Sequence, residues 1–184
     1  SLHEHLSNDE HARNNFINEA RLTALLDHPS IVPIHGLCTD QNGGCHVVMK
    51  LIEGESLKSY LENIRDCYED GGINNFDERK SLLFRLEIFL RVLEAIEYAH
   101  AKGIIHCDIK PENIMMGKFR ETYVMDWGIA KRLDDPATAN IKDEKHLMGS
   151  PRFIAPEILS RQGRYITSDI YSLGVVLFEI TTLD

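Results

Sequence analysis

The sequence predicts an α+β fold of two layers, in which a short strand pair precedes a mainly helical remainder. Two short apolar runs, 31–37 and 45–52, flank the turn-forming residues TDQNGG, a pattern typical of an antiparallel strand pair. Apolar residues then recur at helical spacing over 81–100, and a last helix is expected over 167–183. Since no internal repeat or interdomain linker separates these parts, we expect one domain or a large part of one.

An amphipathic helix is expected before the strand pair, over 14–26. Pro29 ends this helix, because a proline disfavours helical backbone at the residue before it, His28. The strand pair that follows is expected to turn at 42–44. The apolar positions of the helix are Phe16, Ile17, Ala20 and Ala24.

The remainder of the chain is expected to be mainly helical. Helices are predicted over 56–64 and 81–100, with an exposed loop around Gly71 and Gly72 between them. A long irregular segment, 126–157, precedes the last helix. The apolar face of the helix over 81–100 is expected to carry Leu82, Leu86, Phe89, Leu93 and Ile96. Short β-like segments between polar loops are expected at 103–106, 114–116 and 122–125.

The composition argues against several classes of protein. The chain has a net charge of −9 and no stripe of Lys or Arg, which argues against a nucleic-acid partner. Its four cysteines lack CxxC or ligand spacing, so we expect reduced thiols and a cytoplasmic location. Asp169 and Glu179 lie inside the most apolar stretch, 165–183, which favours a buried helix and no membrane contact from this segment.

The segment HCDIKPEN, at 106–113, combines several residue types that chemistry can use. Such residues in a loop are often only solvated, and a lone H-x-D pattern means little. Thirteen residues after Asn113, however, comes DWG at 126–128. A hairpin between them would bring Asp126 beside Asn113, and a carboxylate with an amide oxygen forms a pair of hard ligands suited to Mg²⁺.

Three short motifs occur in a fixed order along the chain: His106-Cys107-Asp108 with Asn113, then Asp126-Trp127-Gly128, then Ala155-Pro156-Glu157. In this order and spacing the sequence resembles the catalytic domain of eukaryotic-type Ser/Thr protein kinases, with a flavour of the bacterial members. The resemblance implies a kinase-like α+β fold, ATP and Mg²⁺ as cofactors, and Ser/Thr hydroxyls of proteins as acceptors.

The resemblance also assigns catalytic roles to four residues. Asp108 matches the residue that orients the acceptor hydroxyl and takes its proton. Asn113 and Asp126 match the Mg²⁺ ligands, and Lys110 matches the lysine that reaches the γ-phosphate in Ser/Thr kinases. Phosphate transfer would then depend mainly on positioning and electrostatics.

Other matches concern the nucleotide. Glu19 matches the Glu of the family's C helix, which pairs with a lysine on the third strand. Met49 matches the gatekeeper position, and the carbonyl of Lys50 and the N–H of Ile52 match the hinge groups offered to adenine. Met115 would pack under the adenine ring.

The remaining matches are structural. Asp169 matches the Asp of the family's F helix that braces the catalytic loop, which explains a carboxylate in an apolar helix. Trp127 replaces the usual Phe before Gly128, and its ring is expected to stack on His106. Glu157 matches a Glu that usually pairs with an Arg of a later helix.

Two activation-segment positions carry expectations of their own. Ser150 is expected to bond Asp108 and Lys110, which favours Ser/Thr over Tyr acceptors. Cys107 replaces the arginine that pairs with a loop phosphate in the family, so we expect activity without that switch. We expect Cys107 to be a small buried spacer rather than a redox-reactive thiol, and Thr138 to be a plain loop residue rather than a phosphorylation site.

The resemblance covers nearly the whole chain but only the middle of the family domain. Residues 1–52 would form the rest of the small lobe, with the C helix, the fourth and fifth strands and the hinge. Residues 53–184 would form the large lobe as far as the F helix. We expect a lysine just before Ser1 in a longer protein, and little kinase activity from the 184 residues alone.

Two other functions are open at this point. A pseudokinase or interaction module would keep the fold without transferring phosphate, and the intact set of Asp108, Lys110, Asn113 and Asp126 argues against it. A small-molecule phosphotransferase of the aminoglycoside type also has an H-x-D-x-x-x-x-N loop. Lys110 and the Ala155-Pro156-Glu157 segment disfavour that reading.

Overall fold

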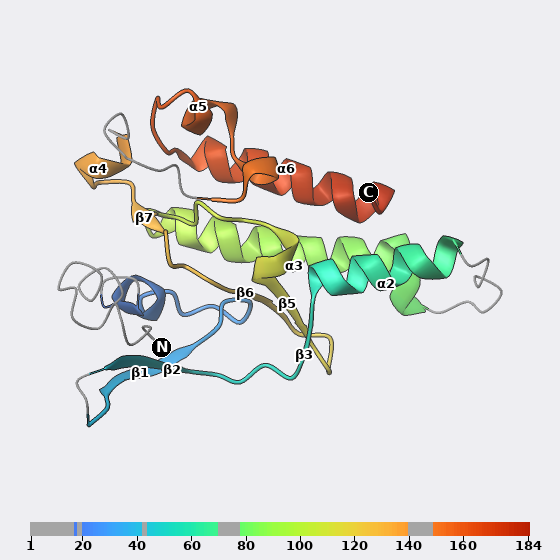
Figure 1. Ribbon diagram of the computed structural model, residues 1–184, viewed down its shortest axis with the longest axis horizontal. Helices are drawn as coiled ribbons and strands as arrows, with labels where there is room; N and C mark the ends of the chain where they lie inside the picture. Colours follow the sequence, from blue (N-terminus) through green and yellow to red (C-terminus); the bar gives the residue numbers. More distant parts are fainter. Residues whose placement is uncertain (1–16, 18–19, 42–43, 70–77, 140–148) are drawn as a thin grey trace.

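Two long helices, α3 (Leu82–Ala101) and α6 (Ile166–Thr182), lie side by side and form the centre of the helical layer (Figure 1). The computed structural model describes residues 17, 20–41, 44–69, 78–139 and 149–184. A third helix, α2 (Leu57–Glu69), precedes α3 in the chain and lies at the same end of the layer as the C-terminus. The predicted α+β fold is confirmed.

The strands form three small sheets rather than one large one. β1 (Ile34–Thr39) pairs antiparallel with β2 (Cys45–Met49). β3 (Gly54–Ser56), β5 (Ile114–Gly117) and β6 (Thr122–Val124) form the second sheet, in the order β3-β5-β6. β4 (Ile104–Ile105) pairs with β7 (Lys131–Arg132). The remaining elements are short: η2 (Glu78–Lys80), η3 (Pro111–Asn113), α4 (Pro136–Ala139), η4 (Pro151–Phe153) and α5 (Pro156–Leu159).

Local sequence explains where α3 begins and ends. The Ser81 hydroxyl accepts a hydrogen bond from the Phe84 N–H at 3.1 Å and so caps the first turn. The helix stops before Gly103, whose φ of 74° favours a glycine and reverses the chain into β4.

The buried face of α3 differs from the predicted one. Leu82 is 45% exposed, and Leu86 and Leu93 are only partly buried against the core. The prediction failed because α3 carries apolar residues on several sides, so helical spacing alone does not choose between neighbouring stripes. The residues of α3 that are buried are Phe84, Arg85, Ile88, Phe89, Val92, Ala95, Ile96 and Ala99.

One hydrophobic cluster joins the helices to the β5–β6 hairpin. It includes Leu57 of α2, Val92 of α3 and Val176 of α6, which are all fully buried. Ile114 and Val124 bring the hairpin into the same cluster. Burial of this apolar area is the main source of stability and fixes the hairpin against the helical layer.

The strand pair and the hairpin meet at one strand position. The first strand was expected from residue 31 but begins at Ile34, because Ile31 instead forms a parallel bridge with Val124. Val124 N–H also donates to the Ser30 carbonyl at 2.8 Å. The antiparallel pair itself is confirmed. Asp40 N–H donates to the Gly44 carbonyl at 2.9 Å across its turn, whose residues 42–43 lie outside the described ranges.

Other predicted boundaries shift by a few residues. The second strand ends at Met49 rather than at residue 52, and α2 continues to Glu69 rather than to residue 64. The irregular segment contains β7, which the sequence did not predict, while the helix predicted over 167–183 is confirmed as α6. Of the helix expected over 14–26, residues 20–24 are helical and most of its first half lies outside the described residues. Within the described ranges, no helix combines the length and apolar character that a membrane span needs.

Candidate active site

A carboxylate of α6 holds the loop after β4 through hydrogen bonds to its backbone. Asp169 is 1% exposed, and it accepts hydrogen bonds from the backbone N–H groups of His106 and Cys107, both at 2.9 Å. His100 of α3 adds a third, from Nε2 at 2.8 Å. A buried carboxylate needs such partners. These hydrogen bonds are the contact that was predicted between this residue and the loop. The part played by His100 was missed, because helical spacing does not reveal which buried His meets which carboxylate.

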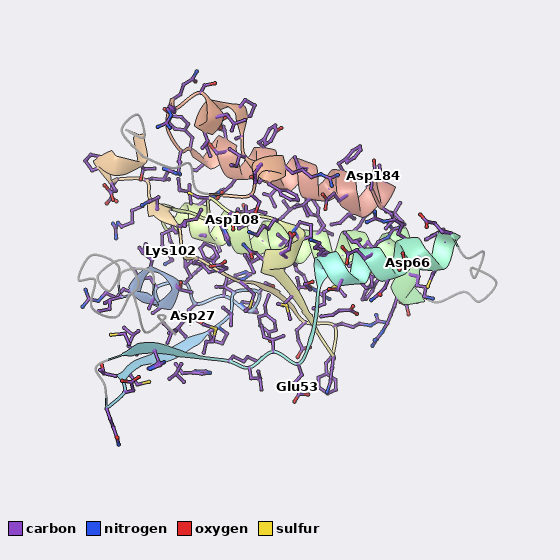
Figure 2. The ribbon with its side chains drawn as sticks, viewed as in Figure 1. Asp27, Glu53, Asp66, Lys102, Asp108 and Asp184 are labelled. Carbon is purple, nitrogen blue, oxygen red and sulfur yellow. The ribbon has the colours of Figure 1, made fainter. Side chains whose placement is uncertain are left out.

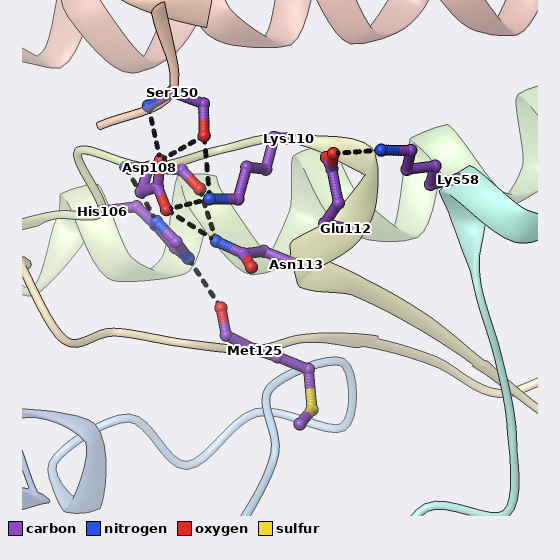
Figure 3. Close-up of polar contacts among 8 residues, drawn as sticks. All are labelled: Lys58, His106, Asp108, Lys110, Glu112, Asn113, Met125 and Ser150. Atoms are coloured by element: carbon purple, nitrogen blue, oxygen red, sulfur yellow. Dashed lines mark hydrogen bonds and ion pairs between the residues drawn. The ribbon is translucent and has the colours of Figure 1, made fainter.

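Asp108 lies at the centre of a polar cluster (Figure 3). Its Oδ2 accepts from Lys110 Nζ at 2.7 Å and from Asn113 Nδ2 at 3.0 Å. Its Oδ1 accepts from the Ser150 backbone N–H at 3.1 Å. Lys110 Nζ also donates to the Ser150 hydroxyl at 2.8 Å, and that hydroxyl lies 3.4 Å from Asp108 Oδ1. The cluster therefore brings together four of the predicted residues and holds the carboxylate in one orientation.

His106 is buried beneath this cluster. Its Nδ1 accepts from the Asp108 N–H at 3.2 Å, so its Nε2 carries the proton that is donated to the Met125 carbonyl at 3.0 Å. Burial lowers the pKa of His106, which keeps the ring neutral and the tautomer fixed. The ring contacts Trp127, with centroids 4.5 Å apart and planes tilted by 51°. The predicted contact is present, but as a tilted pair rather than a stack.

Asp126 follows directly from the β5–β6 hairpin. Met115 lies opposite Tyr123 in the register, and the Met125 N–H donates to the Asn113 carbonyl at 2.8 Å. The hairpin thus returns the chain to Asn113, as the sequence predicted. Asp126 is exposed and has a φ of 59°, an uncommon conformation for a residue other than glycine.

Asn113 and Asp126 fit a divalent cation by their donor chemistry. Both hydrogen bonds of the Asn113 amide nitrogen go to Asp108, so the amide oxygen is turned away from that residue (Figure 3). An amide oxygen and a carboxylate are ligands that Mg²⁺ accepts. Among the described residues no group of three His, Cys, Asp or Glu could hold a metal.

A cavity of about 390 Å³ adjoins these two residues. It lies between the β1–β2 pair and the start of the hairpin, and Met49 and Met115 contribute two of its apolar walls. A mainly apolar cavity with a few polar groups at one end is typical of a cofactor site. Its lining is Ala20, Thr23, Val32, Ile34, Val47, Met49, Glu112, Asn113, Met115, Met125, Asp126 and Trp127.

The hinge residues follow β2 directly. Lys50 N–H donates to the Pro33 carbonyl at 3.1 Å, and Ile52 is half-buried in the connection that leads to β3. Glu19 lies outside the described residues, so its predicted position next to the cavity stays a prediction.

The residues around the activation segment differ partly from expectation. Glu157 lies in the first turn of α5 and accepts a hydrogen bond from the Ser168 hydroxyl at 2.6 Å, a partner that the sequence did not predict. Cys107 is half-buried rather than buried and has a φ of 69°. Gly128 lies in an exposed turn after Trp127. Thr138 lies in α4 rather than in a loop, is 2% exposed, and donates a hydrogen bond to the Arg132 carbonyl at 2.7 Å.

A second cavity, of about 420 Å³, opens beside Ser150 and was not predicted. Four of its charged lining residues form two ion pairs: Lys58 with Glu112 at 3.0 Å and Arg152 with Glu179 at 3.1 Å. Sequence spacing gave no signal for this site, because each pair joins residues more than 25 positions apart.

The two carboxylates of this cavity differ in pKa. Partial burial acts to raise the pKa of Glu112, but the hydrogen bond from Lys58, its own backbone N–H and the Lys58 and Lys110 charges lower it overall. Burial raises the pKa of Glu179, which the Arg152 charge only partly opposes. Glu112 is therefore the more firmly charged of the two.

Comparison with known proteins agrees with the motifs. A family model described as "Protein kinase domain" matches residues 2–184. The chain is similar to the serine/threonine-protein kinases PknD of Chlamydia felis (34% identical, 99% of the chain and 21% of that protein), Chlamydia abortus (35%, 99% and 21%) and Protochlamydia amoebophila (33%, 91% and 18%). The chain thus spans about a fifth of the length of the curated relatives it matches.

Proposed function

Because the chain belongs to the protein kinase domain family, we propose that its protein transfers the γ-phosphate of MgATP to Ser and Thr hydroxyls of other proteins. The observation that carries the proposal is the Asp108 cluster, in which Lys110, Asn113 and Ser150 all contact one carboxylate. This arrangement places a proton acceptor and a cation within one loop, as phosphoryl transfer requires.

Each member of the cluster has its own task. Asp108 orients the acceptor hydroxyl and takes its proton as the new O–P bond forms. Lys110, whose Nζ lies between Asp108 and Ser150, offers positive charge to the transferred phosphoryl group. Ser150 fixes the far side of the carboxylate through its backbone N–H. Asp169 does not touch the reacting atoms and acts as a positioning residue for the loop backbone.

The cavity of about 390 Å³ would hold the nucleotide. Asn113 and Asp126 would hold Mg²⁺, which supplies charge neutralisation for the phosphates when it is bound. Met49 and Met115 would contact the base, with the Lys50 carbonyl and the Ile52 N–H as its hydrogen-bonding partners and Glu19 on the phosphate side.

The same proposal sets the organisation and location of the protein. Residues 1–52 would contribute the small lobe and hinge, and residues 53–184 the large lobe. None of the four cysteines forms a disulfide, which fits a reducing compartment, so the location we propose for the kinase is the cytoplasm.

The test compares phosphate transfer by the full-length protein and its Asp108→Asn variant, using radiolabelled ATP and a mixed Ser/Thr protein acceptor. We expect the variant to lose at least about a hundredfold in rate. Asp134→Asn, which changes an exposed carboxylate paired with Arg132, is the matched control and should transfer at the wild-type rate. No transfer by the wild type would favour a scaffold without kinase activity. Equal transfer by Asp108→Asn and wild type would show that the measured transfer does not depend on Asp108, which also contradicts the proposal.

A further inference from the structure

The side chain of Lys50 connects the hinge to the β5–β6 hairpin. Lys50 Nζ donates a hydrogen bond to the Tyr123 hydroxyl and lies 4.7 Å from the centre of the Tyr123 ring. The two residues are 73 positions apart in the sequence. Tyr123 is only 6% exposed and belongs to β6, so its position is set by the hairpin. The hydroxyl and the ring together give the exposed Lys50 ammonium a defined contact on the hairpin.

The partner of Lys50 is close in sequence to the residues around the nucleotide cavity. Tyr123 lies opposite Met115 in the register of the hairpin and precedes Asp126 by three residues. Met115 and Asp126 line the cavity, as does Met49, the residue before Lys50. The contact therefore joins the residue after Met49 to the hairpin strand that leads to Asp126.

We propose that Lys50 is a positioning residue for the adenine base: its contact with Tyr123 holds the backbone of residues 50–52 at the edge of the nucleotide cavity. The inference rests on the proposed kinase function. It adds a role for the side chain of Lys50 to the role already proposed for its backbone carbonyl. Loss of the contact frees the hinge backbone, so the base is bound less tightly while the phosphate contacts are kept.

The side chain of Lys50 carries a positive charge at neutral pH. The hydrogen bond with Tyr123 raises the pKa of Lys50. Burial opposes this effect, and the interactions with the Tyr123 and Glu121 charges raise the pKa further. The contact also differs from the ion pair of Lys118 with Glu53, in which both side chains are more than half exposed. An exposed partner such as Glu53 restrains a lysine side chain only weakly, whereas Tyr123 is buried.

The experiment measures steady-state kinetics of the full-length protein with ATP as the varied substrate. For Lys50→Met we expect the KM for ATP to rise about two- to fivefold, the range of an exposed cation–π contact, with kcat unchanged. Lys50→Arg keeps a cation over the ring and should restore the wild-type KM. Tyr123→Phe keeps the ring but removes the hydroxyl, and should raise the KM by a smaller factor.

Two inhibitors separate a role in base binding from a general structural effect. Adenosine should inhibit Lys50→Met more weakly, by the same factor as the change in KM. Inorganic tripolyphosphate, which lacks the base, should inhibit both proteins equally.

Lys102→Met is the matched control. Lys102 Nζ lies 5.5 Å from the ring of Tyr98 at the end of α3, so this variant also removes a lysine from a tyrosine ring. Figure 2 shows Lys102 well away from Glu53, which follows the hinge. Its KM for ATP should equal that of the wild type.

Two results would overturn the inference while leaving the kinase function standing. One is an unchanged KM for ATP in Lys50→Met beside an active wild type. The other is an equal weakening of adenosine and tripolyphosphate. If the wild type itself neither binds ATP nor transfers phosphate, the proposed function fails and the inference fails with it.

Discussion

Asp169 in α6 accepts the backbone hydrogen bond of His106 at 2.9 Å, across 63 positions of the sequence. The contact joins the last long helix to the loop that carries Asp108. Together with the bonds from Cys107 and His100, it makes Asp169 the main polar link between the helical layer and the candidate active site. Figure 2 shows Asp108 between α6 and the hairpin strands, where such a link is needed.

Replacing Asp169 with Ala should destabilise the protein. The substitution leaves two backbone N–H groups and His100 without their acceptor inside the core, at a cost of about 2–4 kcal/mol. Urea unfolding followed by circular dichroism measures the loss. Asp134→Ala removes an exposed carboxylate and should change the free energy of unfolding by less than about 0.5 kcal/mol. Equal stability of the two variants would show that the buried contact contributes nothing.

Stability should fall in mild acid because of His106. Burial lowers the pKa of His106 in the folded protein, whereas an unfolded His titrates near 6.5. The unfolded chain therefore takes up a proton as the pH falls through 6.5, and the folded chain does not. The contribution of His106 is complete above about pH 6.5 and is lost below it, by up to about 1.4 kcal/mol per pH unit.

The measurement is the free energy of unfolding between pH 5 and pH 8 for the wild type and for His106→Gln. The variant should show a shallower dependence below about pH 6.5. His35→Gln changes an exposed histidine of β1 and should keep the wild-type slope. Parallel curves for wild type and His106→Gln would contradict the assignment.

Lys110→Met should reduce the rate of phosphate transfer. The substitution removes the cation that contacts both Asp108 and Ser150, so we expect kcat to fall about 10²–10³-fold. Because Lys110 is assigned to the transition state, kcat and kcat/KM for ATP should fall together. Lys118→Met, at an exposed ion pair with Glu53, serves as control and should keep the wild-type kcat. A change in KM alone would show that Lys110 contributes to binding of ATP in the ground state rather than to the transfer step.

Asp126→Asn should weaken Mg²⁺ binding and so reduce activity at low Mg²⁺ concentrations. A neutral amide is a poorer ligand than a carboxylate, so half-maximal activity should need at least about tenfold more Mg²⁺. A titration of activity against Mg²⁺ at fixed ATP gives the shift, and chelation should abolish activity in both proteins. An unchanged midpoint would exclude Asp126 as a ligand.

The sequence predicted the hairpin and the loop well because both depend on local signals. The segments 114–116 and 122–125 carry short β-like patterns around a turn, and the structure pairs them as the predicted hairpin, with Ile114 opposite Val124. The Asp108 cluster followed from motif order, since its members lie within a few residues of one another except for Ser150.

The rest depends on tertiary contacts that spacing does not encode. Ile31 was placed in a strand with its neighbours but pairs with Val124 instead, because the hairpin offers a free strand edge nearby. The buried stripe of α3 was misplaced because several stripes are apolar. Two further contacts join residues that are distant in the sequence, Lys50 with Tyr123 and Lys58 with Glu112. No local sequence pattern predicts such contacts.

The attachment of the β1–β2 pair through Val124 has a mechanical consequence. Val124 pairs with Ile114 on one edge of β6 and meets residues 30–32 on the other, so these backbone contacts attach the strand pair to the rest along one line. Rotation about that line would widen or narrow the cavity between the strand pair and the hairpin. The Asp108 cluster lies on the helical side of this line of contacts. Its geometry would therefore stay constant while the cavity changes in width.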